Sequence, residues 1–521
     1  MIDLGFVYQF VKILFYVFIA FICKTLYQFV YLPWKARGRY SKYKNVAMAE
    51  KFYPFQGDLA IWNQNDARGN GKFQHFIDEA LSEKGYDIRL TQLGPESVID
   101  VCSVKALDEF EKLVPSKIDR YHHRGLPIGY FLKGSLAVTR STENWSIRRK
   151  EMIKKLAINN CSKYIPMMIE IVDKNIQNTP TNHEIDIIQF FSRITIEAVT
   201  KIFFGQSITE KMKEIAYICP KTGEKSTKKF HEFYPQIISN EFEAFIDPKG
   251  KLFSFLVEYK LVEPYITNAK NLEACYSALA EYLETSLDKD SVYFLLYSSK
   301  QYTKHECIMD ALMMIFGGFD TSAHSLASMV RLLKRNPDKY DKLMKELDRC
   351  QITKLDKVPK DEYKTIFEEC DYLSFVTKEA MRLDGPTIET PLYQAIEECD
   401  IAGVRIPKGQ CVSISVYHPH YDSKQWQRPE EFIPERFDPE SELFFKPGTT
   451  EMRHRKSFIP FSFGSRNCLG QTLARLELKV LLSRFLTKVD YEISKKDLEN
   501  NFKYSVYDVR GMNGTITATK Y

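Results

Sequence analysis

The segment 461–470, FSFGSRNCLG, has the residue types that a reactive or metal-binding thiolate requires. A cysteine acts as a ligand or nucleophile in its thiolate form, which nearby N–H groups or positive charge must stabilise. Gly464 permits a tight turn, and Arg466 brings a fixed positive charge two residues before Cys468. Apolar residues at helical spacing follow the cysteine, so we expect it at a helix N-terminus, where the dipole and free amides favour an anion.

Two neighbours of Cys468 suit a flat ligand. Gly470 has no Cβ, so a ring can approach the backbone there. We expect Phe461 to cover the sulfur and keep water out. A lone cysteine before a helix is more often a buried structural thiol, and this segment alone leaves that alternative open.

The elements that must position these residues are mostly helical. Apolar and polar residues alternate at 87–92 and 97–101 around Gly94-Pro95, which predicts a β-hairpin. Short strand-like runs return at 400–416 and near the C-terminus. Helical spacing predicts helices over 142–161, 183–204, 264–287, 303–335, 337–350, 370–383 and 469–486. The sequence therefore predicts a mainly α fold with a minor β portion.

Composition favours one large catalytic domain. The chain has 521 residues, 44% hydrophobic and 13% aromatic, which suffices for a large core. A net charge of +5 from 73 basic and 68 acidic residues gives no reason to expect a nucleic-acid partner. The eleven cysteines are scattered and never form a C-x-x-C pair. This pattern is typical of a protein in a reducing compartment, and it argues against a disulfide framework and against a structural zinc site.

The N-terminal segment differs from the rest of the chain. Residues 6–32 are almost all apolar and long enough to cross a bilayer as a helix, although two lysines interrupt them. The basic residues that follow tend to stay in the cytoplasm. We expect a membrane anchor over 1–34, a basic linker over 35–50 and a cytosolic catalytic domain over 51–521. A cleaved signal peptide is the alternative, but no A-x-A-like site precedes the basic cluster.

The cysteine segment resembles the F-x-x-G-x-R-x-C-x-G haem-binding signature of the cytochrome P450 family, and the resemblance covers about residues 45–521. Four further family motifs occur in the family's order: W-x-x-x-R at 145–149, A/G-G-x-D/E-T-T/S at 317–322, E-x-x-R at 379–382 and P-E-R-F at 434–437. The resemblance implies the cytochrome P450 fold behind an N-terminal transmembrane helix. It also implies haem b (iron protoporphyrin IX), with Cys468 as the metal ligand.

The resemblance assigns roles to individual residues. The Cys468 thiolate would push electron density onto iron and favour O–O cleavage. Asp320 and Thr321 would relay protons and hold the oxygen intermediate, the alternative being a Thr321 hydroxyl bonded to its own helix backbone. Haem propionates would be held by Trp145, Arg149, Arg466 and His418, with a purely structural histidine as the alternative for His418. A structural network would join Glu379, Arg382 and Arg436.

Some features depart from the family pattern. After Arg382, the stretch LDGPTIETPLYQA lacks the usual paired prolines. Tyr393 stands where many members place a basic propionate partner. No Pro-rich hinge follows the apolar N-terminal segment. These differences concern local geometry and not the reaction.

The resemblance implies a monooxygenase that inserts one oxygen atom of O₂ into a lipophilic substrate such as a fatty acid, sterol or xenobiotic. Because the chain has no room for a flavin module, electrons are expected from NADPH-cytochrome P450 reductase, with a b-type cytochrome as a second candidate. The expected location is the endoplasmic reticulum membrane, with a single pass and a cytosolic catalytic domain. A docking site is predicted at a basic cluster, the alternative being a solvated helix face: Arg148, Lys150, Lys154 and Lys155.

Two other functions stay open. One is a haem-thiolate isomerase or dehydratase, which needs neither O₂ nor electrons. Such members often lose the acid–alcohol pair that Asp320 and Thr321 retain here. The other is a non-catalytic haem sensor, which should not need a proton relay.

Overall fold

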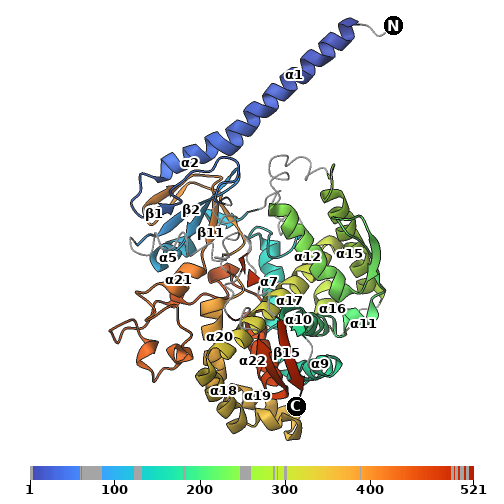
Figure 1. Ribbon diagram of the computed structural model, residues 1–521, viewed down its shortest axis with the longest axis vertical. Coiled ribbons are helices and arrows are strands. Elements are labelled where there is room, and N and C mark those ends of the chain that lie inside the picture. The colour runs from blue at the N-terminus through green and yellow to red at the C-terminus, as the bar shows by residue number, and fades with distance from the viewer. Residues whose placement is uncertain are drawn as a thin grey trace.

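A long N-terminal helix projects from the rest of the molecule in the computed structural model (Figure 1). The structure describes residues 4–521 except 59, 61–84, 122–131, 180–183, 247–259, 286–287, 290, 299–301, 388, 494–497, 499–502, 505–509, 512–514 and 521. Helix α1 (Leu4–Leu26) continues through a π-helical turn (Tyr27–Tyr31) into α2 (Leu32–Tyr40). The helical residues Val7–Tyr40 are long and apolar enough to cross a membrane, by length and composition. The segment expected as a linker, 35–50, thus contains the end of α2 and then strand β1 (Val46–Met48).

A six-stranded mixed sheet lies at one side of the fold, beneath α2 in Figure 1. Its order is β1-β2-β3-β11-β8-β4, made from Val46–Met48, Ile88–Leu93, Glu96–Val101, Cys411–Ile414, Tyr393–Ala395 and Ile118–Arg120. β2 and β3 pair antiparallel, which confirms the predicted hairpin. The outer strand β4 pairs with β8 in a register that sets Arg120 opposite Tyr393.

Smaller sheets and hairpins complete the β portion. They comprise β9 (Cys399–Ile401) with β10 (Val404–Ile406); β5 (Glu184–Asp186), β15 (Thr515–Lys520) and β12 (Val489–Ile493); β13 (Lys503–Tyr504) with β14 (Arg510–Gly511); and β6 (Ile215–Ile218) with β7 (Lys225–Lys228). The β6–β7 hairpin was not predicted. Residues 184–186, which the periodicity assigned to a helix, form strand β5 because they pair with β15.

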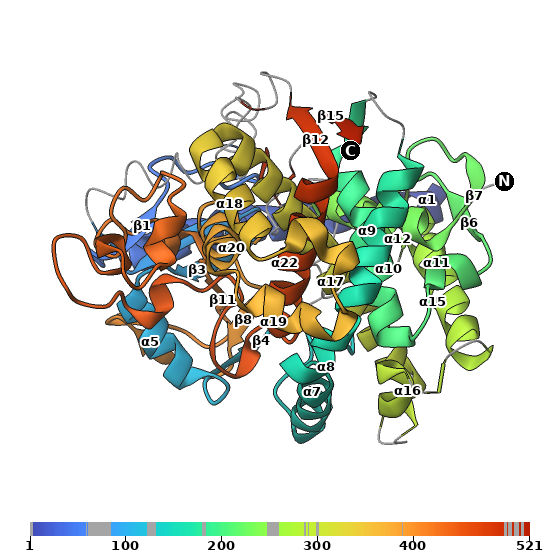
Figure 2. The same ribbon diagram turned by 90° about the horizontal axis from the view of Figure 1, so that it is seen from below.

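Helices make up most of the remaining fold. Their bounds are α5 Val104–Leu113, α7 Glu143–Lys155, α8 Ile158–Cys161, α9 Ile165–Asn178, α10 Ile187–Phe204, α11 Ile208–Lys211, α12 Phe230–Ile246, α15 Tyr265–Thr285, α16 Val292–Tyr297, α17 Lys304–Arg335, α18 Pro337–Arg349, α19 Tyr363–Glu368, α20 Asp371–Asp384, α21 Tyr417–Tyr421 and α22 Gln471–Lys488. Figure 2 shows α17, α20 and α22 between the sheet on one side and α9, α10, α12 and α15 on the other. The mainly α fold with a minor β portion is confirmed.

Helix α17 is the central element, and α10 packs closely against it. It begins with a capping box in which Thr303 accepts from the Glu306 amide while the Glu306 side chain accepts from the Thr303 amide. The hydroxyl of Thr195, on α10, donates to the carbonyl of Phe319 at 2.9 Å. A Cβ at Gly318 would stand 2.5 Å from Cγ2 of Val199, so the absence of a side chain permits this approach.

Gly318→Ala should therefore destabilise the protein, although alanine favours a helix over glycine by about 1 kcal/mol. Val199 is buried and stiff at χ1, so the clash cannot be relieved cheaply. Overpacking of this kind costs about 1–3 kcal/mol. Gly317→Ala is the matched control, because its Cβ would meet only Cε of Met313, at 3.5 Å. Thermal unfolding of both variants measures the difference, and equal melting temperatures would contradict the prediction.

Candidate active site

The cysteine segment forms a tight loop that ends at the N-terminus of α22. A 3₁₀ turn over Gly464–Arg466 precedes Cys468, and Gly464 has the positive φ of 68° that favours glycine. The Cys468 amide donates to the carbonyl of Phe461 at 2.9 Å, which closes the loop. The predicted position of Cys468 ahead of a helix is confirmed.

The thiol of Cys468 lies in surroundings that disfavour its charged form. Its side chain retains accessible surface. Burial nevertheless raises the pKa of this thiol, against the lowering effects of the Gly470 amide and the charges of Arg149 and Arg475. A Cβ at Gly470 would meet no heavy atom within 4 Å, so the backbone is open to a flat ligand there.

Two of the predicted arginines converge on Trp145. The Arg466 guanidinium lies 3.7 Å from the centre of the Trp145 ring, and that of Arg149 lies 5.6 Å from it. The indole N–H itself donates to the carbonyl of Leu136 at 3.0 Å. The ring of Trp145 therefore packs against both arginines. Its N–H is already hydrogen-bonded to the protein backbone.

A third arginine, Arg120, completes the cluster and was missed by the sequence reasoning. Its guanidinium stacks 4.1 Å above the ring of Tyr393, the residue that replaces the family's basic group. The Nε of Arg120 is buried and has no hydrogen-bond partner in the described part of the chain. No sequence motif includes Arg120. The pairing of β4 with β8 brings it beside Tyr393, which lies 273 residues further along the chain. An arginine on the neighbouring strand thus lies beside the tyrosine that occupies the position of the family's basic group.

This cluster carries excess positive charge. Burial and the charge of Arg120 lower the pKa of Arg466 to about 10, although Asp119 opposes this. Burial, and then Arg120, also lower the pKa of Arg149, while Cys468 opposes this. The Asp119 carboxylate pairs with one of these arginines, at 3.1 Å from Nη2 of Arg466. Mutually repelling arginines with an orphaned N–H fit a ligand that carries two carboxylates, such as haem, whose ring the open backbone at Gly470 would accommodate.

His418 has contacts of another kind. Its Nδ1 lies 2.6 Å from the hydroxyl of Ser415, and its ring meets the edge of Tyr86 at 5.3 Å between centroids. These contacts lie at the end of β11 and match the structural alternative. A propionate contact of His418 stays a prediction.

The acid–alcohol pair lies near the middle of α17. The Thr321 hydroxyl donates to the carbonyl of Gly317 at 2.8 Å, which is the backbone alternative considered from the sequence. Burial raises the pKa of Asp320, and His324 partly offsets this. Nδ1 of His324 lies 2.8 Å from the Asp320 carbonyl oxygen and 3.8 Å from its Oδ1. His324 was not singled out in the sequence, although the four-residue spacing marks it as a neighbour of Asp320.

A second acid, Glu477, joins α22 to α17 behind this pair. The hydroxyl of Ser322 donates to Oε2 of Glu477 at 2.9 Å, and both side chains are buried. Burial raises the pKa of Glu477 to about 8, despite the hydrogen bond from Ser322. The carboxyl is therefore mostly protonated at neutral pH.

The raised pKa of Glu477 predicts a pH-dependent stability. Between about pH 4.5 and 8 the folded protein keeps a proton that the unfolded chain releases, so this group's stabilisation is lost as pH rises through that window. The slope is up to about 1.4 kcal/mol per pH unit. Glu477→Gln should flatten the dependence. Denaturant unfolding at pH 6, 7 and 8 measures it, and parallel curves for the variant and the wild type would contradict this origin.

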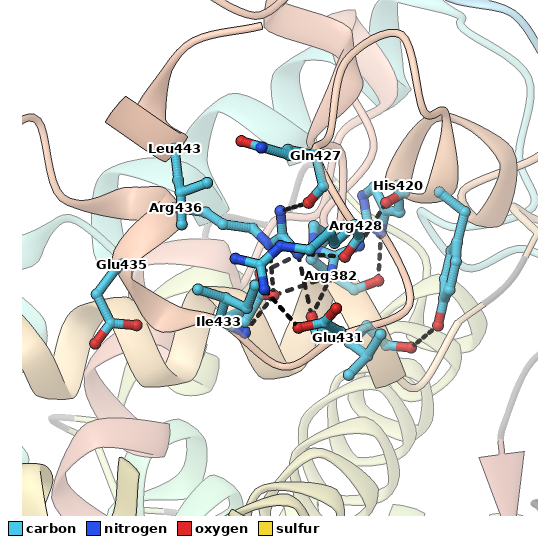
Figure 3. Close-up of polar contacts among 12 residues, drawn as sticks. Arg382, His420, Gln427, Arg428, Glu431, Ile433, Glu435, Arg436 and Leu443 are labelled. Carbon is cyan, nitrogen blue, oxygen red and sulfur yellow. Dashed lines mark hydrogen bonds and ion pairs between the residues drawn. The ribbon is translucent and has the colours of Figure 1, made fainter. Parts of the chain in front are cut away.

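The structural network is confirmed in geometry (Figure 3). Arg382 binds both oxygens of Glu379, at 2.8 and 2.9 Å, and Nε of Arg436 binds Oε1 of Glu379 at 3.0 Å. All three side chains have zero exposure. The arginines extend the network to backbone carbonyls: those of His420 and Glu431 for Arg382, and those of Gln427, Arg428 and Glu431 for Arg436. The network therefore ties α20 to the loop that follows α21.

The prediction that Arg148 belongs to a basic docking surface is wrong. Arg148 is buried and ion-paired with Asp310 and Glu306 of α17, so it cannot face a partner protein. Asp310 also accepts from the Leu136 amide at 2.7 Å, which fixes the loop before α7. Lys154 is exposed and pairs with Glu151 at 2.8 Å. Arg148 lies on the buried face of α7 together with Trp145 and Met152, which the cluster of charges in the sequence did not reveal.

The comparisons with known proteins agree with this site. The sequence profile of the family described as Cytochrome P450 matches residues 55–509, so the chain belongs to the cytochrome P450 family. Membership implies a haem held by a cysteine thiolate, for which Cys468 and the arginine cluster are the fitting residues.

The individual relatives differ in how much of the chain they match. Cytochrome P450 3A7 of Homo sapiens is 24% identical over 391 residues, which cover 71% of this chain and 72% of that protein. Thromboxane-A synthase of Mus musculus is 32% identical over 197 residues, 38% of this chain. The match spans only 34% of the length of that synthase. Putative cytochrome P450 CYP13A5 of Caenorhabditis elegans is 34% identical over 199 residues, 37% of this chain and 35% of its own.

Proposed function

We propose that this protein is a haem-thiolate monooxygenase that inserts one oxygen atom of O₂ into a lipophilic substrate. The observation that carries the proposal is the presence in one fold of the Cys468 loop and the Asp320–Thr321 pair on α17. Bound haem supplies the oxygen-activating chemistry. The protein's own residues supply the ligand, the binding charge and the protons.

Each group has a defined task in this proposal. Cys468 binds the iron, and the loop bond from its amide to the Phe461 carbonyl fixes its position. Arg120, Arg149 and Arg466 hold the propionates, with Trp145 beneath the last two. Asp320 keeps a proton more readily than an exposed acid because burial raises its pKa, which suits it to donate one. The Thr321 hydroxyl, anchored on Gly317, can pass the proton on.

We further propose NADPH-cytochrome P450 reductase as the electron donor, with a b-type cytochrome as a second donor, and the endoplasmic reticulum membrane as the location. The apolar helix Val7–Tyr40 supports a membrane anchor. The similarity to a P450 over most of the chain supports the reductase. Lys150 and Lys154 remain exposed on α7 as part of a docking surface.

A second candidate, rearrangement of an oxygenated substrate without O₂ or electrons, is favoured by the partial match to a relative named as a synthase. The retained acid–alcohol pair favours the monooxygenase. Turnover of lipophilic substrates under ¹⁸O₂ with NADPH and reductase separates the two. Monooxygenation gives product that contains ¹⁸O only when NADPH is present, whereas rearrangement gives unlabelled product without NADPH.

The Thr321→Ala variant tests the proton relay in the same assay. Loss of the hydroxyl should waste reducing equivalents, so less product should form for each NADPH consumed, by about tenfold or more, with more hydrogen peroxide released. Thr321→Ser, which keeps the hydroxyl, is the matched control. Equal coupling in the alanine variant and the wild type would remove Thr321 from the mechanism.

A further inference from the structure

The membrane-anchor helix joins the catalytic domain without a hinge. Residues 4–40 are helical throughout, including the π-helical turn Tyr27–Tyr31. The C-terminal part of this helix, from Phe29 to Tyr40, packs on the domain. Phe29 is 3% exposed and stacks on Phe55 with 6.0 Å between ring centroids. Nη2 of Arg37 donates to the Ala49 carbonyl at 2.6 Å, and the buried Tyr40 donates to Oε1 of Gln410 at 3.3 Å.

The other face of the same segment is aromatic and exposed. Tyr27, Tyr31 and Trp34 are 53%, 44% and 60% exposed. Their spacing of four and three places them on one helix face. The rings form a continuous row, with 5.4 Å between the centroids of the tyrosines and 6.4 Å between Tyr31 and Trp34. Lys35 lies 5.9 Å from the centre of the Tyr31 ring.

The two faces are opposed. Phe29, Pro33 and Tyr40 are buried, whereas Tyr27, Tyr31 and Trp34 of the aromatic row are exposed. The row therefore points away from the domain. Tyr27 and Trp34 are about 10 Å apart along the axis at 1.5 Å per residue. The interfacial layer of one leaflet is about 5–8 Å thick, so the row spans it.

Tyrosine and tryptophan favour this layer, because their rings are apolar and their polar ends stay hydrated. Basic side chains just beyond it meet anionic headgroups at about 1 kcal/mol each. Here Lys35 and Arg39 follow the row and are exposed, while Arg37 binds the domain. The chemistry and the spacing thus match a lipid headgroup layer.

We propose that residues 27–40 form a rigid interfacial collar, which binds the headgroup layer through Tyr27, Tyr31 and Trp34 and holds the catalytic domain at a fixed tilt through Phe29, Arg37 and Tyr40. The proposal rests on the proposed membrane anchor. Its occupant is the lipid headgroup layer. The collar makes the tilt a property of the fold, whereas a flexible linker would leave the domain free to rotate.

The test uses full-length holoprotein, one copy per nanodisc, with discs of phosphatidylcholine and phosphatidylserine. Linear dichroism of the haem in oriented discs reports the tilt, and amide hydrogen exchange of residues 27–50 reports the rigidity without reference to the haem. The wild type should show strong dichroism and slow exchange through Tyr40.

Three variants separate the parts of the collar. Phe29→Ser with Phe55→Ser, and independently a Gly-Ser-Gly insertion after Leu32, should bring the dichroism close to the isotropic value and speed exchange of 29–40 at least tenfold. Phe18→Ser, at an anchor phenylalanine that is 60% exposed, is the control and should change neither. Replacing Tyr27, Tyr31 and Trp34 together by Leu should shift the tilt while exchange stays slow.

Several results would overturn the collar. One is unchanged dichroism and exchange in the insertion variant. A fixed tilt that appears only with two copies per disc would make a second copy the occupant of the aromatic row. Failure of the wild type to stay with the discs would instead refute the proposed anchor, which is a distinct outcome because exchange in 29–40 is then still measurable in solution.

Discussion

Replacing Glu379 by Ala is expected to abolish haem incorporation. The carboxylate lies between two fully buried arginines, Arg382 and Arg436, and also accepts from the Ile433 amide at 3.0 Å. Removing one partner of a buried ion pair costs about 3–5 kcal/mol, because the other charge is left uncompensated. Here one substitution strands two arginines, so the loss approaches the whole stability of a typical domain, about 5–15 kcal/mol.

The measurement is the Soret absorbance per protein after purification, together with the cooperativity of unfolding. Glu431→Ala is the matched control. Its carboxylate pairs at the surface with Arg428, both side chains being more than half exposed, so the change should stay within about 0.5 kcal/mol. A normally loaded Glu379→Ala protein would show that the network is dispensable.

The sequence predicted the three charged members of this network but not its full extent. Their motifs are local, and helix spacing places Glu379 and Arg382 one turn apart. The carbonyls of His420, Gln427 and Arg428 come from irregular loops, whose path no residue pattern specifies. The stacking of Arg453 on Trp426, at 4.2 Å, is hidden for the same reason. Backbone acceptors carry no side-chain signature, so only the fold reveals them.

The proposed haem site also combines residues that the sequence predicted with residues that it did not. Cys468, Gly464 and Gly470 lie where the sequence predicts, because a continuous loop and the start of α22 define them. Arg120 was missed, since its approach to Tyr393 depends on a strand pairing between distant segments. Arg148 was assigned to the surface, because a run of basic residues does not show which side of α7 is buried. The two errors thus arose from a strand pairing between distant segments and from the rotation of α7 about its axis, neither of which a local sequence pattern shows.

The N-terminal helix and α17 illustrate a third case, in which the element was predicted but its neighbours were not. Apolar periodicity located 303–335 to within one residue of α17. It could not show that Gly318 faces Val199 or that Ser322 meets Glu477, since both contacts join segments more than 100 residues apart. Likewise, 35–50 looked like a linker by composition, although the contacts of Arg37 and Tyr40 make it part of the domain.

Replacing Cys468 by Ala should remove the strongly red-shifted Soret band of the reduced CO complex and with it all NADPH-dependent turnover. Only a thiolate ligand donates enough electron density to produce that shift. The surrounding structure should tolerate the change, because the Cys468 amide and not its sulfur closes the loop with Phe461. The variant should therefore remain folded, so that loss of the band reports on ligation and not on collapse of the site.

The reduced-CO difference spectrum of the variant beside the wild type measures this effect. Cys219→Ala is the matched control, because Cys219 lies at the turn of the β6–β7 hairpin and its removal should leave the band intact. If the wild type lacks the band while carrying haem, Cys468 is not the ligand and the monooxygenase proposal fails with it. If Cys468→Ala keeps the band, another of the remaining cysteines must bind the iron, and the assignment of Cys468 as the ligand fails.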